Sequence, residues 1–247
     1  MAKKRSKDKE LPVNDSPFFK SLRKRTIKLY FTKSRNIRRK WNQKEIYQKE
    51  ILEVCLRLSG LLETLRLSRF FIEERRRMPA DHQLKIKNTE FIRYHLECYL
   101  IRSTTFKDLI LKLLNRVYKF GFTEKNGLEY KIIRQAEKDN NTDLLNLLEG
   151  LKIIMSTLHP IRNKIAHGGY HDDVDLILIE GQESTGNIKA KDEYNQTMER
   201  LITRNIIDMY QNELMMATLI LLAYKKLYPI RRKMEKDLIK TKQRGRL

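Results

Sequence analysis

The sequence predicts an all-α protein, a single bundle of four to five helices with basic N- and C-terminal arms. Apolar residues recur at helical spacing along several long stretches. Glycine and proline are scarce, with 9 and 5 residues in a chain of 247, which argues against a sandwich or barrel that needs frequent turns. The hydrophobic share of 40% is enough for most of the chain to fold around a core.

Two long helices are expected first. One runs from residue 42 to about residue 78 and ends at Pro79. The next begins at Thr89 or Glu90 and continues to Gly121, because a glycine is the usual residue just past a helix C-terminus.

The second half of the chain is expected to contribute a short helix near residues 129–138 and a longer one that Thr142 or Asp143 caps. That longer helix runs to His167, before two glycines. Residues 172–191 are predicted to form a loop or a small hairpin. A last long helix covers residues 192–228 and runs into Pro229.

The excess positive charge lies at the two ends of the chain. The formal net charge is +21, and residues 1–40 carry 15 basic and 3 acidic side chains while residues 225–247 carry 10 and 2. We therefore expect a basic, partly helical arm over 1–41, the helical bundle over 42–228 and a basic tail over 229–247. Arms of this kind bind nucleic-acid phosphates with strong salt dependence and little sequence preference.

Apolar and aromatic side chains interleave with the basic residues in the second half of the N-terminal arm. They either stack on bases or form the apolar side of a short helix packed on the body, and we favour the packed helix. These residues are Phe18, Phe19, Leu22, Ile27, Tyr30, Phe31 and Trp41.

A candidate site lies at the end of the helix that begins near residue 142. Its predicted core face consists of Leu151, Ile154, Leu158, Ile161 and Ile165. His167 follows Ile165 by two residues, about 200° round the helix, and so points away from the core. Asn163 is four residues before His167 and shares its face, and the long side chain of Arg162 reaches toward the same cleft.

The sequence Arg162-Asn163 followed by His167 resembles the R-x4-6-H motif of the HEPN superfamily (higher eukaryotes and prokaryotes nucleotide-binding domain). The spacing alone is common, since Arg75, Arg76 and Arg77 all match it with His82. That second match lacks the helical setting, because Pro79 breaks the helix. The resemblance implies a helical bundle that commonly dimerises and often acts as a metal-independent endoribonuclease, including toxins and anti-phage effectors.

A mechanism follows for such a site. His167 is the candidate general base for the RNA 2′-hydroxyl, Arg162 stabilises charge on the phosphate and Asn163 orients the phosphate or the imidazole. His171 and Arg102 are candidates for an assisting role. A two-fold homodimer would supply both base and acid in a composite active site. No metal and no cofactor are expected, and RNA is the expected substrate.

Three other interpretations stay open. The first is a non-catalytic RNA-binding or nucleotide-binding module of the same fold, and the second is a basic scaffold that binds nucleic acid through its arms. In the third, Arg162, Lys164 and His167 only complement the dipole of a helix C-terminus. A membrane-surface protein ranks lowest, since basic residues surround the 18–41 segment rather than occupying one face.

The sequence also carries expectations about location and partners. The basic N-terminus lacks the apolar stretch of a secretory signal, and the longest apolar window, residues 214–224, is too short to span a bilayer. We expect a cytoplasmic protein with no membrane partner. A toxin–antitoxin or phage-defence role, with a neutralising antitoxin or regulatory protein, follows from the resemblance alone. Asp172, Asp173 and Asp175 are expected to be solvated loop residues rather than a metal site.

Overall fold

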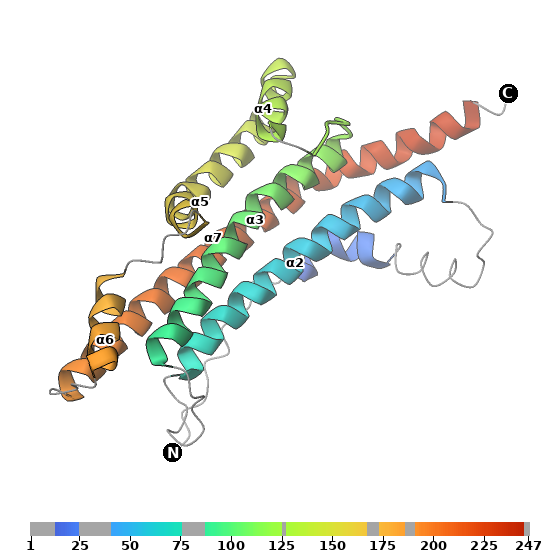
Figure 1. The fold of residues 1–247 in the computed structure, drawn as a ribbon. Helices are drawn as coiled ribbons and strands as arrows, with labels where there is room; N and C mark the ends of the chain where they lie inside the picture. The colour runs from blue at the N-terminus through green and yellow to red at the C-terminus, as the bar shows by residue number, and fades with distance from the viewer. Residues whose placement is uncertain are drawn as a thin grey trace. The chain divides into compact units, whose positions relative to one another are not determined.

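Every regular element in the described part of the computed structural model is helical (Figure 1). The all-α prediction is therefore confirmed. The structure describes residues 13–24, 41–75, 87–124, 127–166, 173–185 and 191–244. The elements are the 3-10 helix η1 (Val13–Asp15), α2 (Gln43–Arg75), α3 (Asn88–Tyr118), α4 (Leu128–Lys138), α5 (Thr142–Ala166), α6 (Val174–Thr185) and α7 (Lys191–Arg244), and residues 17–24 are also helical.

The chain divides into two compact units, and α2, α3, α5 and α7 each contribute residues to both. Unit 1 comprises Met1–Ser59, Leu109–Glu149 and Ala217–Leu247, and unit 2 comprises Gly60–Asp108 and Gly150–Met216. The end of α5, where the candidate motif begins, lies in unit 2.

In unit 1 the described part of the N-terminal arm packs as a short helix. Phe18, Phe19 and Leu22 are at most 2% exposed, and the Phe18 ring stacks on Tyr224 at 4.8 Å between centroids. The favoured packed-helix interpretation is therefore confirmed for these three residues. Trp41 is half-buried, with the Lys49 ammonium 5.6 Å from its ring centroid; Ile27, Tyr30 and Phe31 lie outside the described residues.

Two asparagines begin helices in unit 1. Asn42 and Glu45 exchange hydrogen bonds at the start of α2, each side chain accepting from the other's backbone N–H at 2.9 Å. At the start of α5 the side chain of Asn141 accepts from the N–H of Leu144 at 3.0 Å. The cap is therefore Asn141, one residue before Thr142, the earlier of the two positions expected.

The end of α3 also differs from the expected position. Lys119 adopts a left-handed conformation with φ 55°, and the N–H of Phe120 bonds to the carbonyl of Asn115 at 3.2 Å. This is the usual hydrogen-bond pattern of a left-handed helix stop. The helix therefore ends at Tyr118, and Gly121, with φ 72°, forms part of the following turn.

The prediction of a loop or hairpin over residues 172–191 is wrong, because residues 174–185 form α6. Short apolar runs fit a strand or a helix equally well, and only the packing decides between them. Leu176 and Ile179, three residues apart, are both fully buried, as the spacing of a helix face requires.

The last helix does not stop at Pro229 as expected. α7 continues to Arg244 with Pro229 inside it. A proline within a helix costs about 3 kcal/mol, because it removes a hydrogen bond and crowds the preceding turn. Pro229 itself is exposed, while Leu227, Arg231 and Glu235 around it are buried in unit 1. Burial of this face offsets the cost.

By length and mean hydropathy alone, α7 from Asp192 to Ile239 is apolar enough to cross a membrane, so the apolar stretch is longer than the sequence window suggested. The same helix supplies core residues to both units. Leu201 and Met209 are buried in unit 2, and Ile220 and Leu227 are buried in unit 1. A helix that contributes to a core can have the same length and mean hydropathy as one that crosses a membrane.

Candidate functional site

The end of α5 places Asn163 of the candidate motif opposite a buried helix face. Leu151, Ile154 and Leu158 are at most 5% exposed. Asn163 follows Ile154 by nine residues, about 180° round the helix, and it is exposed. The outward face that carries Asn163 is therefore accessible to a ligand.

The other candidate residues are placed less fully. Arg162 precedes Asn163 in the helical part of α5, and only its backbone is described. His167 and His171 lie outside the described residues. Arg102 is exposed on α3 within unit 2. The structure thus gives Arg162 and Asn163 a common helix, and it does not bring Arg102 to them through any described contact.

The second sequence match to the motif spacing has a structural role at its first residue. The Arg75 side chain is buried, donates from Nε to Asn88 Oδ1 at 2.9 Å and lies 5.0 Å from the Phe91 ring centroid. It ties the end of α2 to the start of α3. Arg76, Arg77 and His82 lie outside the described residues.

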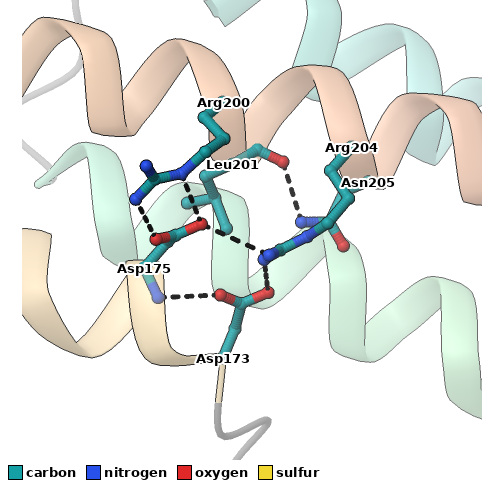
Figure 2. Close-up of polar contacts among 6 residues, drawn as sticks. All are labelled: Asp173, Asp175, Arg200, Leu201, Arg204 and Asn205. Atoms are coloured by element: carbon teal, nitrogen blue, oxygen red, sulfur yellow. Dashed lines mark hydrogen bonds and ion pairs between the residues drawn. The ribbon is translucent and has the colours of Figure 1, made fainter.

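Two aspartates, Asp173 and Asp175, hold the start of α6, the helix that follows the motif (Figure 2). Asp173 accepts from the backbone N–H of Asp175 at 2.9 Å and so caps α6. Arg200 of α7 binds both oxygens of Asp175, at 2.5 and 3.2 Å. Arg204 pairs with Asp173 and lies 3.3 Å from Asp175. We call these four residues the Asp–Arg cluster.

The Asp–Arg cluster is electrostatically balanced, with two carboxylates facing two guanidinium groups. Hydrogen bonding to Arg200, with the charges of Arg200 and Arg204, holds the pKa of Asp175 below its usual range. Because both carboxylates are occupied by arginines, the expectation that Asp173 and Asp175 are simple solvated loop residues is wrong. Asp172 lies outside the described residues.

The other side of α6 is tied to α3, also within unit 2. Arg93 binds both carboxylate oxygens of Glu180, at 2.9 and 2.6 Å, and this pairing lowers the pKa of Glu180. Glu183 accepts from the hydroxyls of Thr89 and Tyr194, at 2.5 and 2.6 Å. The helix that follows the motif is therefore held by two neighbouring helices.

A cavity of about 390 Å³ lies in unit 2 beside α5. Leu158, which lines it, lies one turn before Arg162. Six of the lining residues are apolar or aromatic: Leu96, Tyr99, Leu100, Leu158, Met209 and Met215. Six are polar, and five of those come from α7: Asp173, Arg204, Asn205, Asp208, Gln211 and Asn212. We call the six apolar or aromatic residues the apolar floor of the cavity and the six polar residues its polar wall.

Buried hydrogen bonds hold the floor of the cavity in place. The Tyr99 hydroxyl donates to the backbone carbonyl of Met209 at 2.8 Å. Burial, reinforced by the nearby charge of Glu213, raises the pKa of Tyr99 far above its ordinary value, so the hydroxyl stays a donor. Glu213 pairs with Arg69 of α2 at 3.2 Å. Helices α2, α3 and α7 are therefore locked together beneath the cavity.

The polar wall of α7 was not predicted from the sequence. Its signal is a polar stripe at helical spacing within an apolar helix, at positions 204, 208, 211 and 212. Polar residues at such positions ordinarily face solvent, so the pattern identifies a site only once the opposing apolar floor is known.

The all-α fold and the sequence match described next place this protein in the HEPN class. The sequence matches the model of the Cthe2314-like HEPN family over residues 68–227, and the chain belongs to that family. The matched range contains the motif, the Asp–Arg cluster and the cavity. Comparison with curated proteins and with solved structures finds no match.

Proposed function

We propose that this protein is a metal-independent endoribonuclease that cleaves RNA by attack of the 2′-hydroxyl on the adjacent phosphate. The observation that carries the proposal is the sequence Arg162-Asn163-x-x-x-His167, which begins near the end of α5, where Asn163 is exposed, within the range that matches the HEPN family. The basic composition of the chain, with a net charge of +21, supports a polyanionic substrate.

The chemistry needs only groups that the motif supplies. His167 accepts the proton of the 2′-hydroxyl as O2′ attacks phosphorus, and the bond from phosphorus to O5′ breaks. An acid then protonates the leaving O5′. Arg162 holds the non-bridging oxygens and stabilises the charge that develops on them, while Asn163 orients the phosphate or the imidazole. The products carry a 2′,3′-cyclic phosphate and a 5′-hydroxyl.

One imidazole does not easily serve as base and acid in the same turnover. A homodimer that brings two α5 ends together would supply the acid from the second copy. His171 and Arg102 are the assisting candidates from the same chain. Dimerisation is therefore part of the proposal.

The biological setting is proposed from the family resemblance alone. We propose a cytoplasmic toxin or anti-phage effector whose activity a neutralising antitoxin or regulatory protein restrains. The apolar length of α7 does not oppose this location, because that helix contributes to the cores of both units.

The test compares the parent protein with His167→Ala and Arg162→Ala on bulk RNA in excess EDTA, followed by analysis of the product ends. We expect the parent to produce cyclic phosphate ends and each variant to lose about 10²-fold or more in rate, in line with the loss of a general base or a charge-stabilising donor. Lys152→Ala is the matched control, since Lys152 is an exposed cation on the same helix.

Two results would contradict the proposal in different ways. If His167→Ala cleaved RNA at the parent rate, the motif would not be catalytic, and its residues would only complement the dipole of the helix C-terminus. RNA binding by the parent without any cleavage would favour the second candidate function, a non-catalytic RNA-binding module of the same fold, which the polar wall of the cavity also suits.

A further inference from the structure

We propose that the cavity beside α5 binds a single unpaired nucleobase of the RNA substrate, and that Asp208, Gln211 and Asn212 of α7 read the polar edge of that base. This inference rests on the proposed function, because it assigns a base-specificity subsite to the same RNA-cleaving site.

The shape of the cavity suits a base. Its volume of about 390 Å³ falls in the range of small-molecule pockets, which are mostly apolar with a few convergent polar groups. A nucleobase has two apolar faces and a polar edge, and RNA-binding proteins recognise unpaired bases by packing on the faces and hydrogen bonding to the edge. The apolar residues from α3, α5 and α7 and the polar side chains, mostly from α7, match these two requirements.

Three side chains of the polar wall are uncommitted in the structure. Within the described part of the chain, Asp208, Gln211 and Asn212 make no hydrogen bond or ion pair. Their neighbours on the wall are engaged, since Arg204 pairs with Asp173 and the Asn205 amide donates to the Leu201 carbonyl at 2.9 Å (Figure 2). Positions 208, 211 and 212 are spaced to share one side of α7, so their polar atoms are available together.

The chemistry of these groups favours particular bases. The carboxylate of Asp208 only accepts hydrogen bonds, while the amides of Gln211 and Asn212 both donate and accept. Guanine, adenine and cytosine each present an exocyclic amino group to such an acceptor, whereas the polar edge of uracil offers a single donor, its ring N3–H. The wall therefore selects an amino-bearing base over uracil.

The position of the cavity relates the base to the cleaved bond. Leu158 lines the cavity and lies four residues before Arg162, about 6 Å along the helix axis at 1.5 Å per residue. A base seated against Leu158 therefore belongs to a nucleotide next to the phosphate that Arg162 would hold.

The experiment measures binding of the four ribonucleoside 3′-monophosphates to the full chain by calorimetry or by NMR line shapes. The variants are Asp208→Asn, which is nearly isosteric, and Asn212→Leu. The control is Asn195→Leu, since Asn195 is an exposed asparagine on the same helix that does not line the cavity. Thermal unfolding of all variants checks that the fold is retained.

We expect the parent to bind at least one amino-bearing nucleotide about tenfold more tightly than uridine monophosphate, the discrimination that one good polar pair provides. Asp208→Asn should remove most of that preference, Asn212→Leu should weaken binding, and Asn195→Leu should behave as the parent. Equal binding of all four nucleotides by the parent, or binding that ignores both cavity variants, would overturn the inference.

A parallel RNA cleavage assay separates this inference from the proposed function. If the parent cleaves RNA, and the Asp208 and Asn212 variants bind nucleotides as the parent does, the base subsite is wrong and the proposed nuclease activity is retained. Nucleotide binding that depends on Asp208 supports the subsite even where the parent cleaves no RNA.

Discussion

At the scale of single residues, Asp175 shows how one side chain joins two helices. Its side chain is 8% exposed and its carboxylate receives both Arg200 and Arg204 of α7. The charged form is stabilised in the folded protein, and the pKa lies below the usual range for an aspartate. The ionised carboxylate of Asp175 therefore stabilises the folded protein fully at any pH at which this residue is ionised in both the folded and the unfolded chain.

We predict that Asp175→Asn lowers the free energy of unfolding by about 1–3 kcal/mol at pH 7, the usual cost of removing a charged hydrogen-bond partner. A depressed folded-state pKa contributes stability above the unfolded pKa of about 3.9, and that contribution is lost as the pH falls through the folded value. The difference between parent and variant should thus shrink below about pH 4.

Urea unfolding at several pH values measures this difference. Asp192→Asn is a suitable control, because Asp192 is an exposed aspartate on α7. A constant difference between parent and Asp175→Asn from neutral to acidic pH would show that the ionised carboxylate is not the source of the stabilisation.

Some of the candidate site residues could be predicted from the sequence, and others are found only in the structure. Arg162, Asn163 and His167 follow from motif spacing and helix periodicity in the sequence, and the exposure of Asn163 agrees with that periodicity. Asp208, Gln211 and Asn212 were not predicted from the sequence. A polar stripe on a helix lines a pocket only when residues of other helices, here Leu96, Tyr99 and Leu158, line the same pocket. The polar stripe is visible in the sequence, but the long-range packing that sets apolar residues of other helices opposite it is not.

At the scale of elements, the continuation of α7 past Pro229 depends on a buried charged pair in unit 1. Arg231 is fully buried, lies 3.3 Å from Glu235 and donates to the Ser21 hydroxyl at 2.6 Å. Its guanidinium also lies 5.1 Å from the Phe18 ring centroid. The pair thus connects the last turns of α7 to the helical segment 17–24.

We predict that Arg231→Met alone destabilises the protein by about 3–5 kcal/mol, because it leaves the Glu235 carboxylate buried without its partner. The double variant Arg231→Met with Glu235→Met should recover most of this loss, since apolar residues of similar volume often replace a buried pair at little cost.

Chemical denaturation of the two single variants and the double variant measures the coupling between the residues. As a control, Lys233→Met replaces an exposed cation of the same helical turn. If the double variant were as unstable as the sum of the singles, the role assigned to the pair would be wrong.

Helix boundaries also show where sequence reasoning succeeds. The long periodic runs of α2 and α3 were recognisable, because each has a sustained apolar face and a clear stop. The helix α6 was not predicted, because a single short apolar run carries no periodicity. Its capping residue Asp173 acts locally on the Asp175 N–H, and the pairing with Arg204 that also holds it comes from a distant part of the chain. The prediction that the last helix ends at Pro229 was wrong, because burial of the neighbouring residues in unit 1 outweighs the intrinsic cost of a proline within a helix.

At the scale of the whole molecule, the distribution of charge takes on a different meaning once the fold is known. Part of the basic sequence at the two ends is structural: residues 17–24 pack in unit 1, and α7 carries C-terminal basic residues along a helix to Arg244. Removing residues 1–40 and 225–247 would delete parts of a core as well as charge. Substitution of individual basic residues is therefore the sounder test of electrostatic binding.

We predict that replacing Lys3, Lys4, Arg5, Lys7 and Lys9 by serine weakens RNA binding and reduces its salt dependence, with little effect on cleavage at saturating RNA. For single-stranded RNA, each ionic interaction with a phosphate that the substitutions remove should reduce the slope of log affinity against log salt by about 0.7. Filter binding across a range of salt concentrations measures the slope, and an unchanged slope would show that these residues do not bind phosphate.

Arg204 belongs to two features at once, since it pairs with Asp173 at the start of α6 and lines the cavity. A ligand that contacts Arg204 in the cavity would therefore be thermodynamically linked to the anchoring of α6. A ligand that draws the guanidinium away from Asp173 weakens the α6 cap, and a change at Asp173 that releases Arg204 alters ligand affinity by the same factor. One side chain would thus make ligand binding at the cavity and the stability of the α6 cap reciprocal quantities.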